Sequence, residues 1–171
     1  PGAIWILTDR SGPAGFSNQG VIATNYSEVG ISASFSTDDL NGLSVGGGQL
    51  NLAHSHINNS GRVLSPSSYD AGAGTHRPWV LGSGTIVEGG VIDVGAGDFV
   101  GSAAFHNVSI EGLLEIQNTT PDGGLAELEI SGGLQGNGRI RVAGSGTLIS
   151  KGVQMWDGPT IELAGDAATT A

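Results

Sequence analysis

The chain has 171 residues, contains no cysteine and carries 31 glycines, while only 5% of its residues are aromatic. This length suits a single domain, and the lack of cysteine excludes disulfide and thiolate chemistry. With 6 Lys and Arg against 16 Asp and Glu, the net charge of −10 argues against nucleic acid and anionic lipid as partners. No apolar run approaches the ~18 residues of a membrane span, so we expect no membrane insertion.

The first 80 residues contain strand signals in a less regular pattern than the rest of the chain. Apolar residues 4–7 predict a first strand or an end cap. Val29, Ile31, Ala33 and Phe35 then alternate with small residues, as in a strand with one buried face. Further along, we expect a turn at residues 38–42, short strands at 43–45 and 50–52, and a long loop at 58–78.

Residues 82–163 repeat one short pattern, in which alternating aliphatic residues are followed by glycine. The aliphatic units are residues 85–87, 91–94, 108–110, 114–116, 128–130, 140–142, 147–149, 153–155 and 161–163. Glycine between the units permits the left-handed backbone of tight corners. No segment shows the 3.6-residue period of a helix, and residues 164–171 resemble a flexible polar tail. The chain is therefore predicted to be all-β.

Two all-β architectures compete, a β-solenoid and a β-sandwich or jelly roll. Sandwich strands usually have about 5 to 6 residues, whereas a solenoid uses strands of roughly two to four residues in coils of roughly 20. Val94 and Ile116 lie 22 positions apart, and Ile110 and Ile130 lie 20 apart. We therefore predict a β-solenoid with about four coils in residues 82–163, and the sandwich is the alternative.

The inward positions of this solenoid should carry its aliphatic residues, because side chains alternate across a strand. The predicted core residues are Ile86, Ile92, Val94, Val108, Ile110, Leu114, Ile116, Leu128, Ile130, Ile140, Val142, Leu148, Val153, Met155, Ile161 and Leu163.

The glycine-punctuated run LEISGGLQGNGRIRVAGSGTL at residues 128–148 resembles the repeats of bacterial autotransporter passengers and filamentous-haemagglutinin-like adhesins. Proteins of that kind are right-handed parallel β-helices. The resemblance implies the same fold here, export to the cell surface, and an adhesive or passive structural role, often within a longer fibre.

Histidines are the first candidates for metal binding. His54 and His56 lie two positions apart, so an extended backbone would place both imidazoles on one face. A metal site needs three or four converging donors, which His76 and His106 could complete. The alternative interpretation is that all four are ordinary surface histidines.

Asp93 and Asp98 flank a Gly-rich segment that resembles one imperfect copy of the calcium-binding turns of repeat proteins. Aspartate oxygens and backbone carbonyls are the ligands that Ca²⁺ prefers, so weak Ca²⁺ binding is the one cofactor that the sequence suggests. Turn-forming aspartates are the simpler interpretation.

Parallel β-helices also include polysaccharide lyases and hydrolases, whose catalysis requires clustered carboxylates on an outer face. Charged residues that should point outward are Asp93, Glu111, Glu115, Glu127, Glu129, Glu162, Arg139 and Arg141. The motif set of polygalacturonases cannot be assembled, because Gly-His-Gly is absent and the pair Asp38 and Asp39 stands alone. Solvated charges explain these residues better. A lectin would instead expose aromatic rings, and Trp79 and Trp156 are its candidates.

We therefore expect a non-catalytic structural or adhesive module outside the cell or on its surface, without catalytic or cofactor-binding residues. A carbohydrate-active enzyme and a lectin-like glycan-binding domain are the alternatives. Residues 160–163 are followed by no capping segment, and an open solenoid end exposes unpaired backbone groups. We expect the chain either to belong to a longer protein or to self-associate into an oligomer or filament; a monomer is the alternative.

Overall fold

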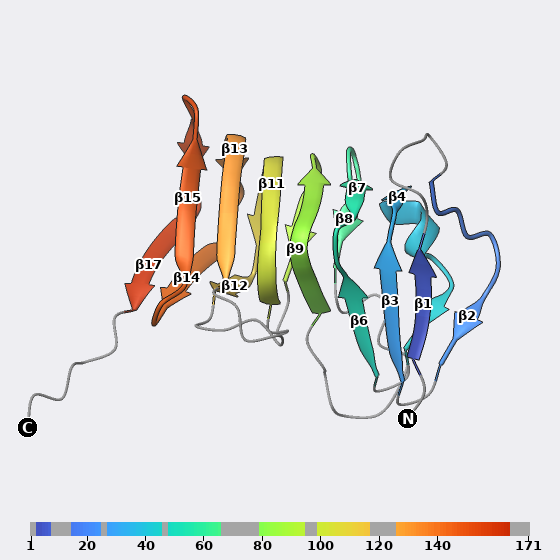
Figure 1. The fold of residues 1–171 in the computed structure, drawn as a ribbon. Helices are drawn as coiled ribbons and strands as arrows, with labels where there is room; N and C mark the ends of the chain where they lie inside the picture. The colour runs from blue at the N-terminus through green and yellow to red at the C-terminus, as the bar shows by residue number, and fades with distance from the viewer. Residues whose placement is uncertain are drawn as a thin grey trace, which may run out of the picture.

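The computed structural model describes residues 3–7, 15–24, 27–45, 48–65, 79–94, 99–116 and 126–164, and the chain folds as a parallel β-solenoid (Figure 1). All strand pairs among these residues are parallel, which confirms the predicted solenoid and excludes the sandwich. In the same residues, no helix is long and apolar enough to cross a membrane.

The elements in chain order are β1 (Ala3–Leu7), β2 (Ile22–Ala23), β3 (Glu28–Ser32), β4 (Ser34–Ser36), the 3-10 helix η1 (Thr37–Leu40), β5 (Leu43–Ser44), β6 (Gln49–Leu52), β7 (His56–Asn58), β8 (Val63–Leu64), β9 (Trp79–Glu88), β10 (Val91–Asp93), β11 (Phe99–Glu111), β12 (Leu113–Ile116), β13 (Glu127–Gln135), β14 (Arg139–Ala143), β15 (Thr147–Lys151), β16 (Trp156–Asp157) and β17 (Thr160–Ala164).

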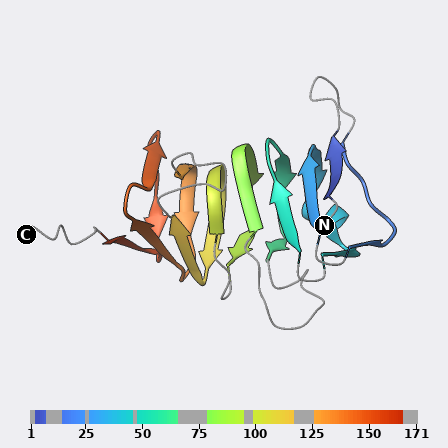
Figure 2. The same ribbon diagram turned by 60° about the horizontal axis from the view of Figure 1, so that its bottom comes forward.

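One strand of each coil belongs to a long sheet whose order is β1, β3, β6, β9, β11, β13 and β15. Figure 2 shows the same stack, running from the coil of β1 to the coil of β15. Val80 pairs with Val100 and Leu128 with Leu148, so a coil takes 20 residues at both places. Asn51 pairs with Val80, a coil of 29 residues, because this coil carries an insertion. The strands β9, β11, β13 and β15 confirm the four coils predicted for residues 82–163.

Two further faces of the solenoid are present in the described residues. The second face contains β8, β10, the last residues of β11 and β13, and β16. The third face contains β2 paired with β5 near the N-terminus, and β12, β14 and β17 near the C-terminus. Side chains on the inner side of all three faces fill the solenoid.

Inward residues at equivalent positions of successive coils pack on one another in columns. Phe35, Ile57, Val87, Phe105 and Ile130 form one column through β4, β7, β9, β11 and β13, and each is at most 6% exposed. Full burial of such a side chain contributes about 1.5–3 kcal/mol relative to its exposure. These columns are therefore the main source of stability in the stack.

Three strands have more than twice the predicted two to four residues. β9 has 10 residues, β11 has 13 and β13 has 9. Each contains a residue with left-handed backbone, Gly84 in β9 (φ 75°), Asn107 in β11 (φ 53°) and Gly132 in β13 (φ 74°). The register of β11 on β13 shifts between His106 and Val108, so pairing resumes after a bulge. β11 and β13 thus turn a corner without ending, and each contributes to two faces.

Most of the predicted core is confirmed. Fully buried members are Ile92, Val94, Val108, Ile110, Leu114, Ile116, Leu128, Ile130 and Ile140, and partly buried members are Val142, Leu148 and Ile161. The prediction for Ile86 is wrong, because its neighbours Thr85 and Val87 point inward and are 1% and 0% exposed. All three residues are β-branched, so the pattern did not reveal which phase of the alternation faces the core.

Val153, Met155 and Leu163 were also predicted to be buried and are exposed by 104%, 78% and 79%. Residues 153–155 form no strand, since β16 begins only at Trp156. Leu163 does occupy an inward position in β17, but no described coil follows to cover it.

The predicted strand with Val29, Ile31, Ala33 and Phe35 is confirmed as β3 and β4, and all four side chains are buried. The predicted loop at residues 58–78 begins too early, because residues 58–65 still contain the end of β7 and the whole of β8. Residues 66–78 and the predicted tail after Ala164 lie outside the description. The predicted turn at residues 38–42 starts with η1.

Candidate functional site

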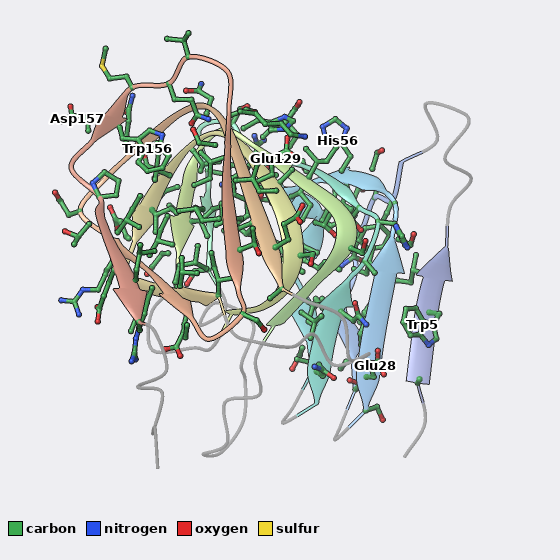
Figure 3. All side chains as sticks on the ribbon, turned by 60° about the vertical axis from the view of Figure 1, so that its left-hand side comes forward. Trp5, Glu28, His56, Glu129, Trp156 and Asp157 are labelled. Atoms are coloured by element: carbon green, nitrogen blue, oxygen red, sulfur yellow. The ribbon has the colours of Figure 1, made fainter. Side chains whose placement is uncertain are left out.

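Charged side chains gather on the outer face of the long sheet. Glu88 of β9 lies between two histidines: its Oε2 is 3.1 Å from His56 Nε2 on the preceding coil, and its Oε1 is 3.8 Å from His106 Nδ1 on the following coil. On the next two coils, Lys151 Nζ lies 2.5 Å from Glu129 Oε2. His56 and Glu129 project from the same outer face (Figure 3). These groups pair between neighbouring coils.

The third face carries a second set of ion pairs. Arg141 of β14 reaches Glu115 of β12 at 3.6 Å and Glu162 of β17 at 3.9 Å, and Arg139 lies 3.7 Å from Glu162. Because β14 lies between β12 and β17, each of these contacts again connects successive coils. The predicted outward direction of these four side chains is confirmed.

A shallow hollow of about 220 Å³ lies beside Glu129 on the outer face of the long sheet. Its lining comes from three successive coils: Ser83, Gly84, Thr85, Ile86, Ser102, Ala103, Ala104, Glu127 and Glu129. Small residues make up much of the lining, among them Gly84 of β9 and Ala104 of β11. The wall on β13 carries two carboxylates, and Ser102 Oγ accepts a hydrogen bond from the Glu127 backbone N–H at 3.1 Å. Carboxylates and hydroxyls of this kind can bind the hydroxyl groups of a small polar ligand.

The two histidines that were predicted as metal ligands have different contacts in the structure. His54 has a left-handed backbone (φ 54°), which interrupts the alternation, and its imidazole lies over Gly84. His56 instead pairs with Glu88. His76 lies outside the described residues. Within the described part of the chain, no three His, Asp or Glu side chains are arranged to hold a metal ion.

The predicted calcium turn is only partly described. Asp93 is the last residue of β10, on the second face of the solenoid. Residues 95–98, which include Asp98, lie outside the description. Calcium binding by this pair stays a prediction.

Of the two tryptophans predicted to bind glycans, only Trp156 has a side chain within the description. Trp156 is 38% exposed, and its Nε1 donates a hydrogen bond to Gln154 Oε1 at 3.0 Å. The side chain of Trp79 lies outside the description. Trp5 is 49% exposed and covers Gly30, where a Cβ would overlap the indole ring. Trp5 and Trp156 lie at opposite ends of the stack (Figure 3), so they cannot bind one sugar ring together.

Sequence reasoning missed the contacts of Asp38 and Asp39. Asp38 Oδ2 lies 2.6 Å from Arg62, and this hydrogen bond lowers the pKa of the Asp38 carboxyl. For Asp39, burial disfavours the charged form, but hydrogen bonds from the Ser36 N–H (2.9 Å) and Oγ (2.8 Å), among others, outweigh it and lower the pKa. The pattern Ser-x-x-Asp before η1 was a usable signal, because it is a capping box with Asp in place of Glu.

Comparison with protein-family models, with curated proteins and with solved structures gives no match for this chain. The functional argument therefore depends on the geometry described above.

Proposed function

We propose that this chain is a non-catalytic structural or adhesive module that acts outside the cell or on its surface. The supporting observation is that outward charges pair from coil to coil. Glu88, Glu129 and Arg141 each have their partners on adjacent coils. Catalysis of polysaccharide cleavage would instead require charged groups that converge on one scissile bond. Pairs spread along the axis stabilise a rod.

The energetic balance also supports a rigid scaffold. Exposed ion pairs contribute only about 0.2–1 kcal/mol each, whereas each fully buried aliphatic or Phe side chain contributes about 1.5–3 kcal/mol. The fold is therefore held by its inner columns, and its outer faces are free to carry groups that bind other molecules. A surface of this kind suits an adhesive module, because binding groups on strands are held in place.

A polysaccharide depolymerisation assay tests the proposal against its enzymatic rival. The purified full chain is incubated with neutral and uronic-acid polymers, and reducing ends and unsaturated products are measured over time. We expect no cleavage. Release of oligosaccharides from any polymer, lost on denaturation of the protein, would contradict the proposal.

A lectin-like function is a second candidate, and the hollow beside Glu129 is the observation that favours it. A glycan array with the purified chain would identify a bound sugar. Glu127 is exposed and lines the hollow, whereas Glu111 is exposed elsewhere, so Glu111→Gln is a matched control for Glu127→Gln. If the hollow binds the sugar, we expect Glu127→Gln to weaken binding about tenfold, the loss of one charge-assisted hydrogen bond. Equal affinities of the two variants would exclude the hollow.

A further inference from the structure

Among the described residues, no coil covers the inner columns at the end of the stack that holds β15 and β17. Ile116 of β12, Val142 of β14 and Leu163 of β17 occupy one column, and their exposure rises from 2% at Ile116 to 79% at Leu163. Leu148 and Ile161 also continue columns of buried residues and are only partly buried. The last coil therefore presents an apolar surface along the axis of the stack.

The backbone of β17 has a free edge on the same side. The Thr160 N–H donates to the Gly138 carbonyl at 3.0 Å, and the Ala164 carbonyl accepts from the Gly144 N–H at 3.3 Å. Alternate residues of a parallel strand direct their N–H and C=O groups to opposite edges. The polar groups of Ile161 and Leu163 therefore point away from β14, which is the one partner of β17 among the described residues.

The first coil has the matching free edge at the other end of the stack. In β2, the Ile22 N–H donates to Gly42 at 3.0 Å and the Thr24 N–H donates to Ser44 at 2.8 Å. The backbone groups of Ala23 consequently point away from β5. In the chain, β2 directly precedes the long-sheet strand β3, and β14 directly precedes the long-sheet strand β15. Because β17 pairs with β14, β2 and β17 occupy equivalent places in their coils.

We propose that copies of this chain associate head to tail, with the first coil of one copy packed on the last coil of the next. The proposal rests on the structural role proposed above and names its partner. All strands of the stack run in one direction along their faces, so a second copy placed ahead on the axis continues each sheet without reversal (Figure 1). Ala23 can then pair with the free edge of β17, while Ile22 extends the inner column that Ile161 leaves open.

A second copy satisfies more of the free groups than an unrelated apolar partner would. The last coil exposes both an apolar surface and strand edges, and only another parallel coil covers both. The first coil of this chain supplies that arrangement. Such a contact joins two different surfaces, so it does not close on itself and produces a filament rather than a dimer. The net charge of −10 opposes association, because the copies repel one another. Association should therefore be measured at about 0.15 M salt, where charges are screened beyond a Debye length of about 8 Å.

Two variants that block opposite ends provide the test, by sedimentation velocity and light scattering on the full chain. Leu163→Glu places a charge on the last coil, and Ala23→Pro removes the outward N–H of β2 while leaving the bonds of Ile22 and Thr24. Val63→Glu is the control, because Val63 is 52% exposed in the middle of the stack. Circular dichroism and thermal melting establish that each variant is folded; Val21→Pro replaces Ala23→Pro if the latter melts early.

We expect the wild type and Val63→Glu to form species larger than a dimer as concentration rises. Each end variant alone should stay monomeric, and an equimolar mixture of the two should form a 1:1 dimer and nothing larger, because one free head meets one free tail. A wild type that stays monomeric up to millimolar concentration would overturn the inference, as would self-association of Ala23→Pro alone. The depolymerisation assay decides the proposed function separately.

Discussion

Asn59 joins three coils from inside the solenoid, and its removal should destabilise the fold strongly. Its side chain is 0% exposed. Its Nδ2 donates to the carbonyls of Gly89 (3.1 Å) and Val91 (2.9 Å) on the following coil, and its Oδ1 accepts from Thr37 Oγ1 (2.7 Å) on the preceding one. Asn59→Ala would leave two partly buried carbonyls and the buried Thr37 hydroxyl without this partner.

An unsatisfied buried polar group costs about 1–3 kcal/mol, and water entering the new void would recover part of that loss. We therefore expect Asn59→Ala to lower the free energy of unfolding by about 3–5 kcal/mol, a large part of the roughly 5–15 kcal/mol of a typical domain. Urea titration followed by circular dichroism measures this change as a lower midpoint at unchanged slope.

Asn58→Ala is the matched control. Asn58 precedes Asn59 but is exposed, and its Oδ1 accepts only the Ser60 N–H at 3.1 Å. We expect this substitution to cost about 1 kcal/mol or less. Asn59→Asp should be no more stable than Asn59→Ala, because a carboxylate would face two carbonyl oxygens. A loss below about 1 kcal/mol for Asn59→Ala, or a stable Asn59→Asp, would refute the argument that these hydrogen bonds hold the coils together.

Two other substitutions test the corners of the coils. Gly90→Ala should lower the free energy of unfolding by at least about 2 kcal/mol more than Gly61→Ala. Both glycines have a left-handed backbone (φ 70° and 69°), so the backbone strain of an alanine is similar at the two positions. A Cβ at Gly90 would overlap the Asn59 carbonyl oxygen and lie 2.6 Å from the Arg62 carbonyl oxygen, whereas no atom lies within 4 Å of a Cβ at Gly61. Equal urea midpoints would contradict this. Asp39→Asn should lower stability at neutral pH. Since folding lowers the pKa of Asp39, its contribution is present above the unfolded value of about 3.9 and is lost as pH falls through the folded value. The two urea midpoints should therefore converge in acid, and a constant difference would contradict the assignment.

The outer charges show how far a candidate site can be inferred without a structure. The alternation of side chains along the predicted strands was enough to show that Glu115, Glu129 and Arg141 point outward. That Glu88 lies between His56 and His106 did not, because those residues are neighbours only through the stacking of three coils. Which outer residues become neighbours depends on the number of residues in each corner, and that number varies from coil to coil. The hollow beside Glu129 likewise depends on how β9, β11 and β13 are aligned with one another.

The direction of a side chain in a strand is a local property, so the alternation in the sequence determined most of the core, including Val29, Ile31, Leu128 and Ile130. The glycine content of the sequence also determined the all-β class, because glycine at this density disfavours helices. Only the tertiary structure decided where strands bend. The left-handed backbone of Asn107 carries β11 from one face to the next, and a lone asparagine is too common a residue to mark this corner in the sequence. Only the stacking decided that Leu163, inward like Ile116, is exposed, because burial in a solenoid requires a coil on both sides.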